Sequence, residues 1–308
     1  MKLRSLLAGL LLGLISFGAL HAQDNAAAVM ADLQALVTKI QTKLRAGQNT
    51  EAALQPELAA FDELFAKYRE QKTDPVAQIL FSRAMLHAQV LGDHEKAKTF
   101  LQQIKTDFAG TQAAANVDRV IESLERTAKA QATQAALVGK TAPELHFKWS
   151  STGELKTLSS LKGKVVVLDF WATWCGPCVA TFPQIRELVS HYKGMDVVVV
   201  GVTSIQGAVM GLQPARIDTT GNPAKEMELM RDYIKAKEIT WTIAFSEEEV
   251  FNPDYGITGI PHMVIVAPDG KIRHTGLHPG MPHEEKLQKI DALLKEFGKP
   301  VLSSSANK

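Results

Sequence analysis

One stretch of the sequence, residues 164 to 178, constrains the fold more than any other. An apolar run is followed by an acid, two aromatic residues and a cysteine pair, namely Val165, Val166, Val167, Leu168, Asp169, Phe170, Trp171, Cys175 and Cys178. The β-branched run has the composition and length of a strand that is buried on both faces of a sheet. A Gly-Pro break follows, so both cysteines are predicted at the start of the next helix.

Cysteines in this position have a defined chemistry. The first turn of a helix presents unpaired backbone N–H groups and a partial positive charge, which favour a thiolate over a thiol. The thiolate is the form that attacks disulfides. The chain contains no cysteine other than Cys175 and Cys178. We therefore interpret the two as one redox pair rather than as a static disulfide or half of a zinc site.

The same stretch resembles a known family. Residues 165 to 178 (VVVLDFWATWCGPC) resemble the active-site segment of thioredoxins, and the sequence from Gly139 (GKTAPELHF, then GELKTLSSLKGK) resembles the TlpA/ResA-like branch of secreted thiol-disulfide oxidoreductases. A Cys-x-x-Cys alone is ambiguous, whereas a strand, an aromatic pair, Cys-Gly-Pro-Cys and a later Gly-Ile-Pro in this order are specific. The resemblance implies an α/β thioredoxin fold, with a mixed central sheet flanked by helices.

The resemblance also implies roles for individual residues. Cys175 is expected to be the exposed nucleophile, with a pKa below the usual value of about 8.5 and nearer about 7, and Cys178 the more buried cysteine that resolves the mixed disulfide. The further expected site residues are Asp169 and Pro261 in catalysis and Trp174, Gly176, Pro177 and Ile260 in substrate binding. Trp171 and Trp174 are expected beside the cysteines, although either could be an ordinary core residue.

Asp169 occupies the place where thioredoxins carry a buried acid. Burial without a charge partner raises the pKa of a carboxyl group, which can then relay a proton to Cys178 as the mixed disulfide resolves. An acid at a water-filled edge without a role is the alternative. Thioredoxins also place a lysine near this acid, and residues 197–203 contain no lysine that matches it.

Gly259-Ile260-Pro261 corresponds to the cis-proline loop of the family. Cis peptide bonds are largely confined to proline, so we expect a cis Ile260–Pro261 bond beside the cysteines, which leaves the backbone of Ile260 free to pair with substrate. Thioredoxins usually have threonine next, whereas this chain has His262, which could tune the thiolate or could instead lie at the surface or behind the residues of the site.

The N-terminus has the pattern of a signal peptide. Lys2 and Arg4 precede an apolar stretch that ends at Leu20, and the small residue Ala22 follows. We therefore expect residues 1–22 to direct secretion across the inner membrane to the periplasm, with an uncleaved membrane anchor as the alternative. Removal of this segment changes the formal net charge from +1 to −1, which gives no reason to expect nucleic acid as a partner.

The remaining chain divides into an all-α domain and the thioredoxin-like domain. Residues 23–137 are rich in helix-forming residues and include the linker at 131–138 and one tetratricopeptide-like hairpin at 75–108, with Asp74 and Asp93 as N-caps. A single copy favours a small helical bundle over a solenoid. In the second domain, residues 138–299, we expect a β-hairpin at 139–162, a helix kinked at Pro183, and an insertion at 203–224 over the active-site edge or without a role. Residues 300–308 form a tail.

The sequence as a whole predicts a protein that reduces or isomerises disulfides of secreted proteins or apocytochromes, re-reduced by a membrane electron donor, with no cofactor or metal. Gly176-Pro177 is the dipeptide of reducing thioredoxins rather than of strong oxidants. A thiol peroxidase of the same fold and a non-catalytic scaffold remain as alternatives. A copper chaperone of the Sco type would have three residues between its cysteines instead of two.

Overall fold

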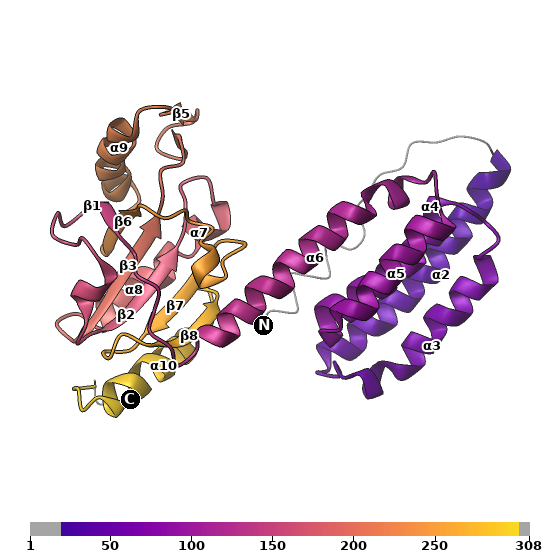
Figure 1. Ribbon diagram of the computed structural model, residues 1–308, viewed down its shortest axis with the longest axis horizontal. Coiled ribbons are helices and arrows are strands. Elements are labelled where there is room, and N and C mark those ends of the chain that lie inside the picture. The colour runs from indigo at the N-terminus through magenta and orange to yellow at the C-terminus, as the bar shows by residue number, and fades with distance from the viewer. Residues whose placement is uncertain (1–19, 302–308) are drawn as a thin grey trace. The chain divides into compact units, whose positions relative to one another are not determined.

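The computed structural model describes residues 20–301, and this part of the chain forms two compact units that divide after residue 128 (Figure 1). Most of the expected signal peptide and of the tail lies outside the described residues. Between residues 20 and 301, no helix is both long enough and apolar enough to cross a membrane.

The first unit is entirely helical, as its composition predicts. Its helices are α2 (Leu20–Arg45), α3 (Glu51–Tyr68), α4 (Asp74–Leu86), α5 (His94–Asp107) and the first part of α6 (Gln112–Leu137) (Figure 1). Leucine, isoleucine, valine and phenylalanine side chains on facing helices form one buried core. A single π-helical turn at His87–Leu91 extends α4, and Gly92 ends it in the left-handed region at φ 70°.

The helix caps of this unit confirm one prediction and correct another. Asp93 caps α5, because its side chain accepts a hydrogen bond from the backbone of Lys96. Asp74 does not cap its own helix, which has Thr73 at the N-cap position. Its carboxylate instead accepts a 2.8 Å hydrogen bond from the backbone N–H of Ala113, in the first turn of α6. Asp74 thereby satisfies a backbone donor that has no partner within α6.

The second unit is built on a six-stranded mixed sheet with the order β1-β6-β3-β2-β7-β8. The strands are β1 (Phe147–Ser150), β2 (Val165–Phe170), β3 (Val197–Thr203), β6 (Thr242–Ser246), β7 (His262–Val266) and β8 (Ile272–Leu277). β3 pairs in parallel with both β2 and β6, whereas the β1–β6, β2–β7 and β7–β8 pairs are antiparallel. This arrangement is the expected thioredoxin-like fold.

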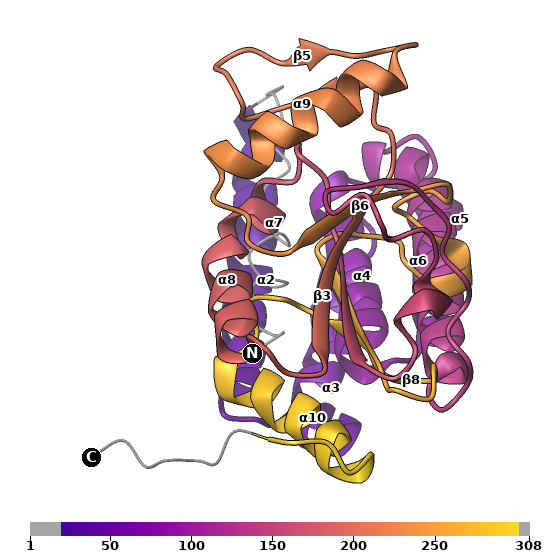
Figure 2. The same ribbon diagram turned by 90° about the vertical axis from the view of Figure 1, so that its left-hand side faces the viewer.

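Both faces of the sheet are covered. The helices α7 (Gly176–Ala180), α8 (Phe182–His191), α9 (Pro223–Ala236) and α10 (His283–Glu296) contribute to the core on one face, together with Val165 and Val167 of β2. Figure 2 shows α9 and α10 at opposite ends of the sheet. The alternate residues Val166, Leu168 and Phe170 pack on the other face. Because both faces are buried, β2 is apolar along most of its length.

Three further expectations concern local structure. The hairpin expected at 139–162 is reduced to a short antiparallel contact around the bridge between His146 and Thr157, while β1, the regular strand of this segment, pairs with β6. An isolated hairpin is marginal in water, whereas pairing along a sheet edge supplies a buried face. The kink expected at Pro183 is confirmed, since α7 and α8 are separated at Thr181. The expected linker at 131–138 lies mostly in the last turns of α6.

Candidate active site

The topology of the sheet brings the cysteine segment and the proline loop to the same edge. β2 and β7 are antiparallel, and Phe170 at the end of β2 pairs with His262 at the start of β7. The residues that follow β2 therefore lie next to those that precede β7. The Ile260–Pro261 peptide bond is cis, as the sequence predicts.

The two cysteines form a disulfide at this edge, with 5.2 Å between their Cα atoms. Cys175 is the N-cap of α7, and its Sγ atom accepts a hydrogen bond from the backbone N–H of Cys178 at 3.2 Å. This N–H would stabilise negative charge on the same sulfur after reduction.

The expectation that Cys175 is exposed is wrong for the disulfide form. Its exposed fraction is 4%, close to the 1% of Cys178. Its Sγ atom is bonded to that of Cys178, while the neighbouring residues Trp174, Gly176 and Pro177 are exposed. The surface that surrounds the disulfide is therefore formed by these flanking residues.

Asp169 is buried, as expected, on the sheet face that also carries the cysteines. Side chains alternate along a strand, so Asp169 shares this face with Val165 and Val167, which belong to the same core as Cys175 and Cys178. Only 1% of Asp169 is exposed, and its Oδ1 atom has no hydrogen-bond partner in the described part of the chain. Burial raises the pKa of Asp169 to about 7, and the charge of Lys286 acts in the opposite direction.

The raised pKa predicts a pH-dependent gain in stability for Asp169→Asn in the oxidised protein. Unfolded Asp169 loses its proton near pH 3.8, whereas the folded protein keeps it up to about pH 7. The folded state thus binds more protons in this window, and wild-type stability falls as pH rises through it, by at most about 1.4 kcal/mol per pH unit. We expect the variant to exceed the wild type at pH 7.5 and to lose this advantage toward pH 4 in urea unfolding. An advantage that grows on acidification would contradict the assigned pKa.

Lys286 is the residue that sequence reasoning missed, because it lies outside residues 197–203, which contain no matching lysine. It lies on α10 and is completely buried. It precedes Ile290 and Leu294 at intervals of four residues, and both belong to the core on the Asp169 face. Burial lowers the pKa of Lys286, while the charges of Glu187 and Asp169 raise it. A lysine in register with the apolar stripe of its own helix was the available signal.

The loop before α10 connects Lys286 to the cysteine helix. The Lys286 ammonium group donates a 2.7 Å hydrogen bond to the carbonyl of Pro279. A side chain on the next residue, Gly280, would lie 3.3 Å from the methyl group of Thr181. Thr181 in turn donates through its hydroxyl to the carbonyl of Cys178 at 2.7 Å. Lys286 is thus bonded to the loop that lies beside Thr181, and Thr181 is bonded to the backbone of Cys178.

The two tryptophans of the site have different environments. Trp171 is fully buried and packs against Phe182 and Tyr233, so it is a core residue. Trp174 has 39% of its surface exposed, and its indole N–H donates to Gln206 Oε1 at 2.9 Å. Of the pair, Trp174 alone is available to a substrate.

The insertion at 203–224 is hydrogen-bonded to the cysteine loop. It contains the short strands β4 (Ala208–Val209) and β5 (Ile217–Asp218). The buried carboxylate of Glu226 accepts hydrogen bonds from the backbone of Gln206 and Gly207 at 2.8 and 2.9 Å, which fixes the start of the insertion. The backbone N–H of Met210 donates to the hydroxyl of Thr173, two residues before Cys175.

His262, the first residue of β7, is buried, with an exposed fraction of 7%. Its Nε2 atom accepts a hydrogen bond from the backbone N–H of Gly276 and lies 3.3 Å from the hydroxyl of Thr275. The alternative that His262 is a surface residue is therefore wrong. In residues 20–301, no group of three or more His, Cys, Asp or Glu side chains is arranged to hold a metal ion.

Comparison with known proteins gives matches over the second unit. Residues 137–294, just over half of the chain, match the Redoxin family. The thioredoxin-like protein YneN of Bacillus subtilis is 30% identical over 155 residues, which are 50% of this chain and 78% of YneN. The thiol-disulfide oxidoreductase ResA of the same organism is 25% identical over 134 residues, 44% of this chain and 64% of ResA.

A third relative is much longer. The protein SUPPRESSOR OF QUENCHING 1, chloroplastic, of Arabidopsis thaliana is 29% identical over 191 residues, which cover 61% of this chain. The chain spans only 16% of that protein, and slightly less than two thirds of ResA.

Proposed function

The chain belongs to the Redoxin family, and we propose that it is a thiol-disulfide oxidoreductase in which Cys175 and Cys178 exchange electrons with disulfides. The observation that carries this proposal is the Cys175–Cys178 disulfide at the end of β2, with the backbone N–H of Cys178 directed at the first sulfur. The name of the relative ResA, a thiol-disulfide oxidoreductase, supports the same activity.

The reductive reaction takes place in two exchanges. The Cys175 thiolate attacks a substrate disulfide, so that a bond forms between Cys175 Sγ and one substrate sulfur while the other leaves as a thiolate. Cys178 then loses its proton and attacks Cys175 Sγ. This releases the second substrate thiolate and forms the Cys175–Cys178 disulfide, so the substrate gains the two electrons that the protein loses.

We propose that Asp169 accepts the proton that Cys178 must lose. A general base is most effective when its pKa lies near the working pH, and burial raises the pKa of Asp169 to about 7. The buried ammonium of Lys286 favours the ionised carboxylate, which is the form that can accept a proton. Ile260, whose bond to Pro261 is cis, would pair through its backbone groups with an extended segment of the substrate.

The substrates that fit this proposal are disulfide-containing proteins outside the cytoplasm. The expected signal peptide at residues 1–22 supports a periplasmic location, and a membrane electron donor would return the disulfide to the dithiol there.

The direction of electron flow can be tested by a redox titration. Gly176-Pro177 is the dipeptide of thioredoxin, whose potential is about −270 mV, and no charged residue between the cysteines overstabilises the thiolate. We expect a glutathione titration to give a potential well below about −180 mV, the value of protein disulfide isomerase. A higher potential would make the protein a better oxidant than reductant.

The activity itself is tested by reduction of insulin with dithiothreitol as the electron source. The proposal predicts faster precipitation of the insulin B chain with the wild type than with the Cys175→Ser/Cys178→Ser double variant. Rapid peroxide consumption without insulin reduction would favour a thiol peroxidase, and the absence of both activities would favour a scaffold.

A further inference from the structure

Three exposed apolar side chains lie beside the loop that carries Cys175. Trp174, Met210 and Phe251 have exposed fractions of 39%, 40% and 44%. Trp174 directly precedes Cys175, and its ring centroid lies 6.1 Å from that of Phe251. The backbone N–H of Met210 donates to the hydroxyl of Thr173, which places Met210 beside the same loop. We call these three residues the apolar rim.

Each residue of the rim has at least one buried chain neighbour. Gly211, which follows Met210, is exposed, whereas the other chain neighbours have exposed fractions of 9% or less: Thr173, Cys175, Val209, Val250 and Asn252. Single exposed apolar side chains are common on protein surfaces, whereas a group of them marks an interaction site. A group that is already ordered loses little conformational entropy when a partner binds.

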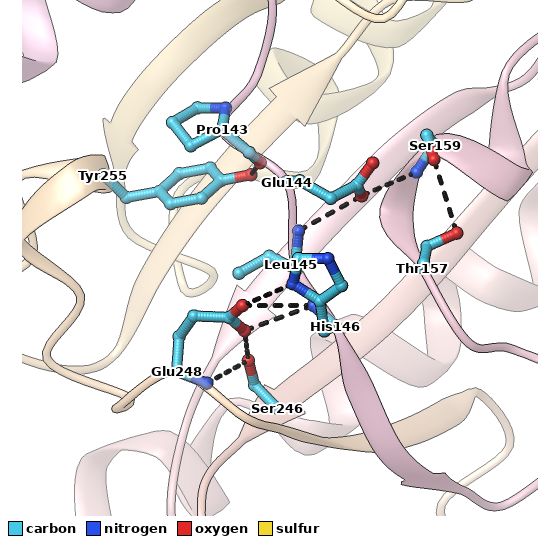
Figure 3. A network of polar contacts seen from close by, with 9 residues as sticks. All are labelled: Pro143, Glu144, Leu145, His146, Thr157, Ser159, Ser246, Glu248 and Tyr255. Atoms are coloured by element: carbon cyan, nitrogen blue, oxygen red, sulfur yellow. Dashed lines mark hydrogen bonds and ion pairs between the residues drawn. The ribbon is translucent and has the colours of Figure 1, made fainter.

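The loop that presents Phe251 is fixed by the polar network of Figure 3. This loop follows β6, and Glu248 within it accepts from the ring Nδ1 of His146 at 2.9 Å. Figure 3 shows Glu248 between His146 and Ser246, with both carboxylate oxygens engaged. The next residue but one, Val250, donates its backbone N–H to the hydroxyl of Ser204 at 3.0 Å. The loop is thus held on both sides of Glu249.

Two side chains of the insertion connect the three parts of the rim. The amide of Gln206 accepts from Trp174 and donates to the hydroxyl of Ser204 at 2.9 Å. Ser204 in turn accepts from Val250, beside Phe251. The cysteine loop, the insertion and the loop after β6 are therefore joined through buried Ser204, and the rim is one surface rather than three separate exposures.

The rim is bordered by negative charge on the side of Phe251, whereas Lys237 lies beside Gly211 on the side of Met210. Glu247 and Glu249 are exposed on the loop that carries Phe251. Neither of them forms an ion pair with any residue between 20 and 301, while the intervening Glu248 pairs with His146. An acidic border favours a partner with positive charge at the matching position.

We propose that the apolar rim, with Glu247 and Glu249, is a docking surface for an extended polypeptide. In this polypeptide, a large apolar residue adjoins the disulfide cysteine and a basic residue follows further along the same side. The inference rests on the proposed function, because a substrate sulfur must reach Cys175 and the chain that carries it must then cover Trp174. The surface is continuous with the disulfide and complementary in charge to such a segment. A small disulfide that extends no further than its two sulfurs would make none of these contacts.

The wild type is tested with three peptides in single-turnover experiments on the reduced protein. Each peptide carries one cysteine in a disulfide with 2-mercaptoethanol. The first has phenylalanine beside the cysteine and lysine two residues further on, the second replaces phenylalanine with serine, and the third replaces lysine with glutamate. We expect the first peptide to react about 10-fold faster than the second, the factor typical of one apolar contact, and faster than the third at low ionic strength.

Variants then locate the effect on the protein. The measured quantity is the ratio of the rate with the first peptide to the rate with bis(2-hydroxyethyl) disulfide. Phe251→Ser should lower this ratio by about 10-fold, and Met210→Ser should lower it as well. Val138→Ser is the matched control, because Val138 is 50% exposed. It adjoins Gly139, which bonds to Ile272 at the start of β8, at the opposite edge of the sheet. This control should leave the ratio unchanged.

Equal rates with all three peptides, or an equal fall of the ratio in Val138→Ser, would overturn the docking surface. Reduction of bis(2-hydroxyethyl) disulfide by the wild type would still uphold the proposed function in that case. A reduced protein that reacts with no disulfide would overturn the proposed function and, with it, the docking surface.

Discussion

Cys175→Ser is expected to lower the rate of disulfide reduction by about 10³-fold or more, because a serine hydroxyl can neither act as a thiolate nor form a disulfide. Cys178→Ser should keep the first exchange and stop there, since no second thiol remains to release the substrate. Insulin reduction measures the first effect. Mass spectrometry after mixing with a peptide disulfide measures the second, as a covalent adduct on Cys175.

The reduced wild type provides a control for the assigned roles. The N–H of Cys178 is directed at Cys175 Sγ, so Cys175 should react first with an alkylating reagent at neutral pH. In the described structure, the sulfur of Cys178 accepts no such hydrogen bond, and Cys178 is 1% exposed. Faster alkylation of Cys178, or a stable peptide adduct on Cys178 in the Cys175→Ser variant, would reverse the two roles.

The local features of the fold could be predicted from the sequence where they depend on neighbouring residues. The valine run of β2, the cysteines that follow it and the proline of Ile260–Pro261 are local patterns, and each occupies its expected place. Pro183 likewise starts α8, where its missing N–H group is not needed.

Features that depend on tertiary contacts could not be predicted in this way. Asp74 has the sequence context of an N-cap, but its carboxylate accepts a hydrogen bond from the start of α6 instead. Lys286 lies near Asp169 only because α10 packs against the sheet, so the residues of β3 gave no indication of it. Cys175 is buried in the disulfide form, and the sequence does not specify which redox state the structure adopts.

Asp169→Asn is expected to slow the resolving exchange by about 10²-fold or more at pH 8, while the first exchange changes little. Asp169 is the proposed acceptor of the Cys178 proton, and general bases contribute about 10² to 10⁴ in rate, whereas an amide cannot accept this proton. 5,5′-Dithiobis(2-nitrobenzoate) measures both steps, because attack by Cys175 releases one coloured thiolate and resolution by Cys178 releases the second. At pH 8, the second phase should be about 10²-fold slower in the variant than in the wild type.

The pH dependence of the second phase tests the assignment further. In the wild type, this rate should rise as Asp169 ionises around pH 7 and then level off, because burial raises the pKa of Asp169 to about 7. Lys286→Met removes a positive charge that lowers this pKa, so the rise should move to higher pH, and Lys286→Arg should restore it. Equal slowing of both phases in Asp169→Asn, with no change in the pH profile, would show that Asp169 supports the fold without taking the proton.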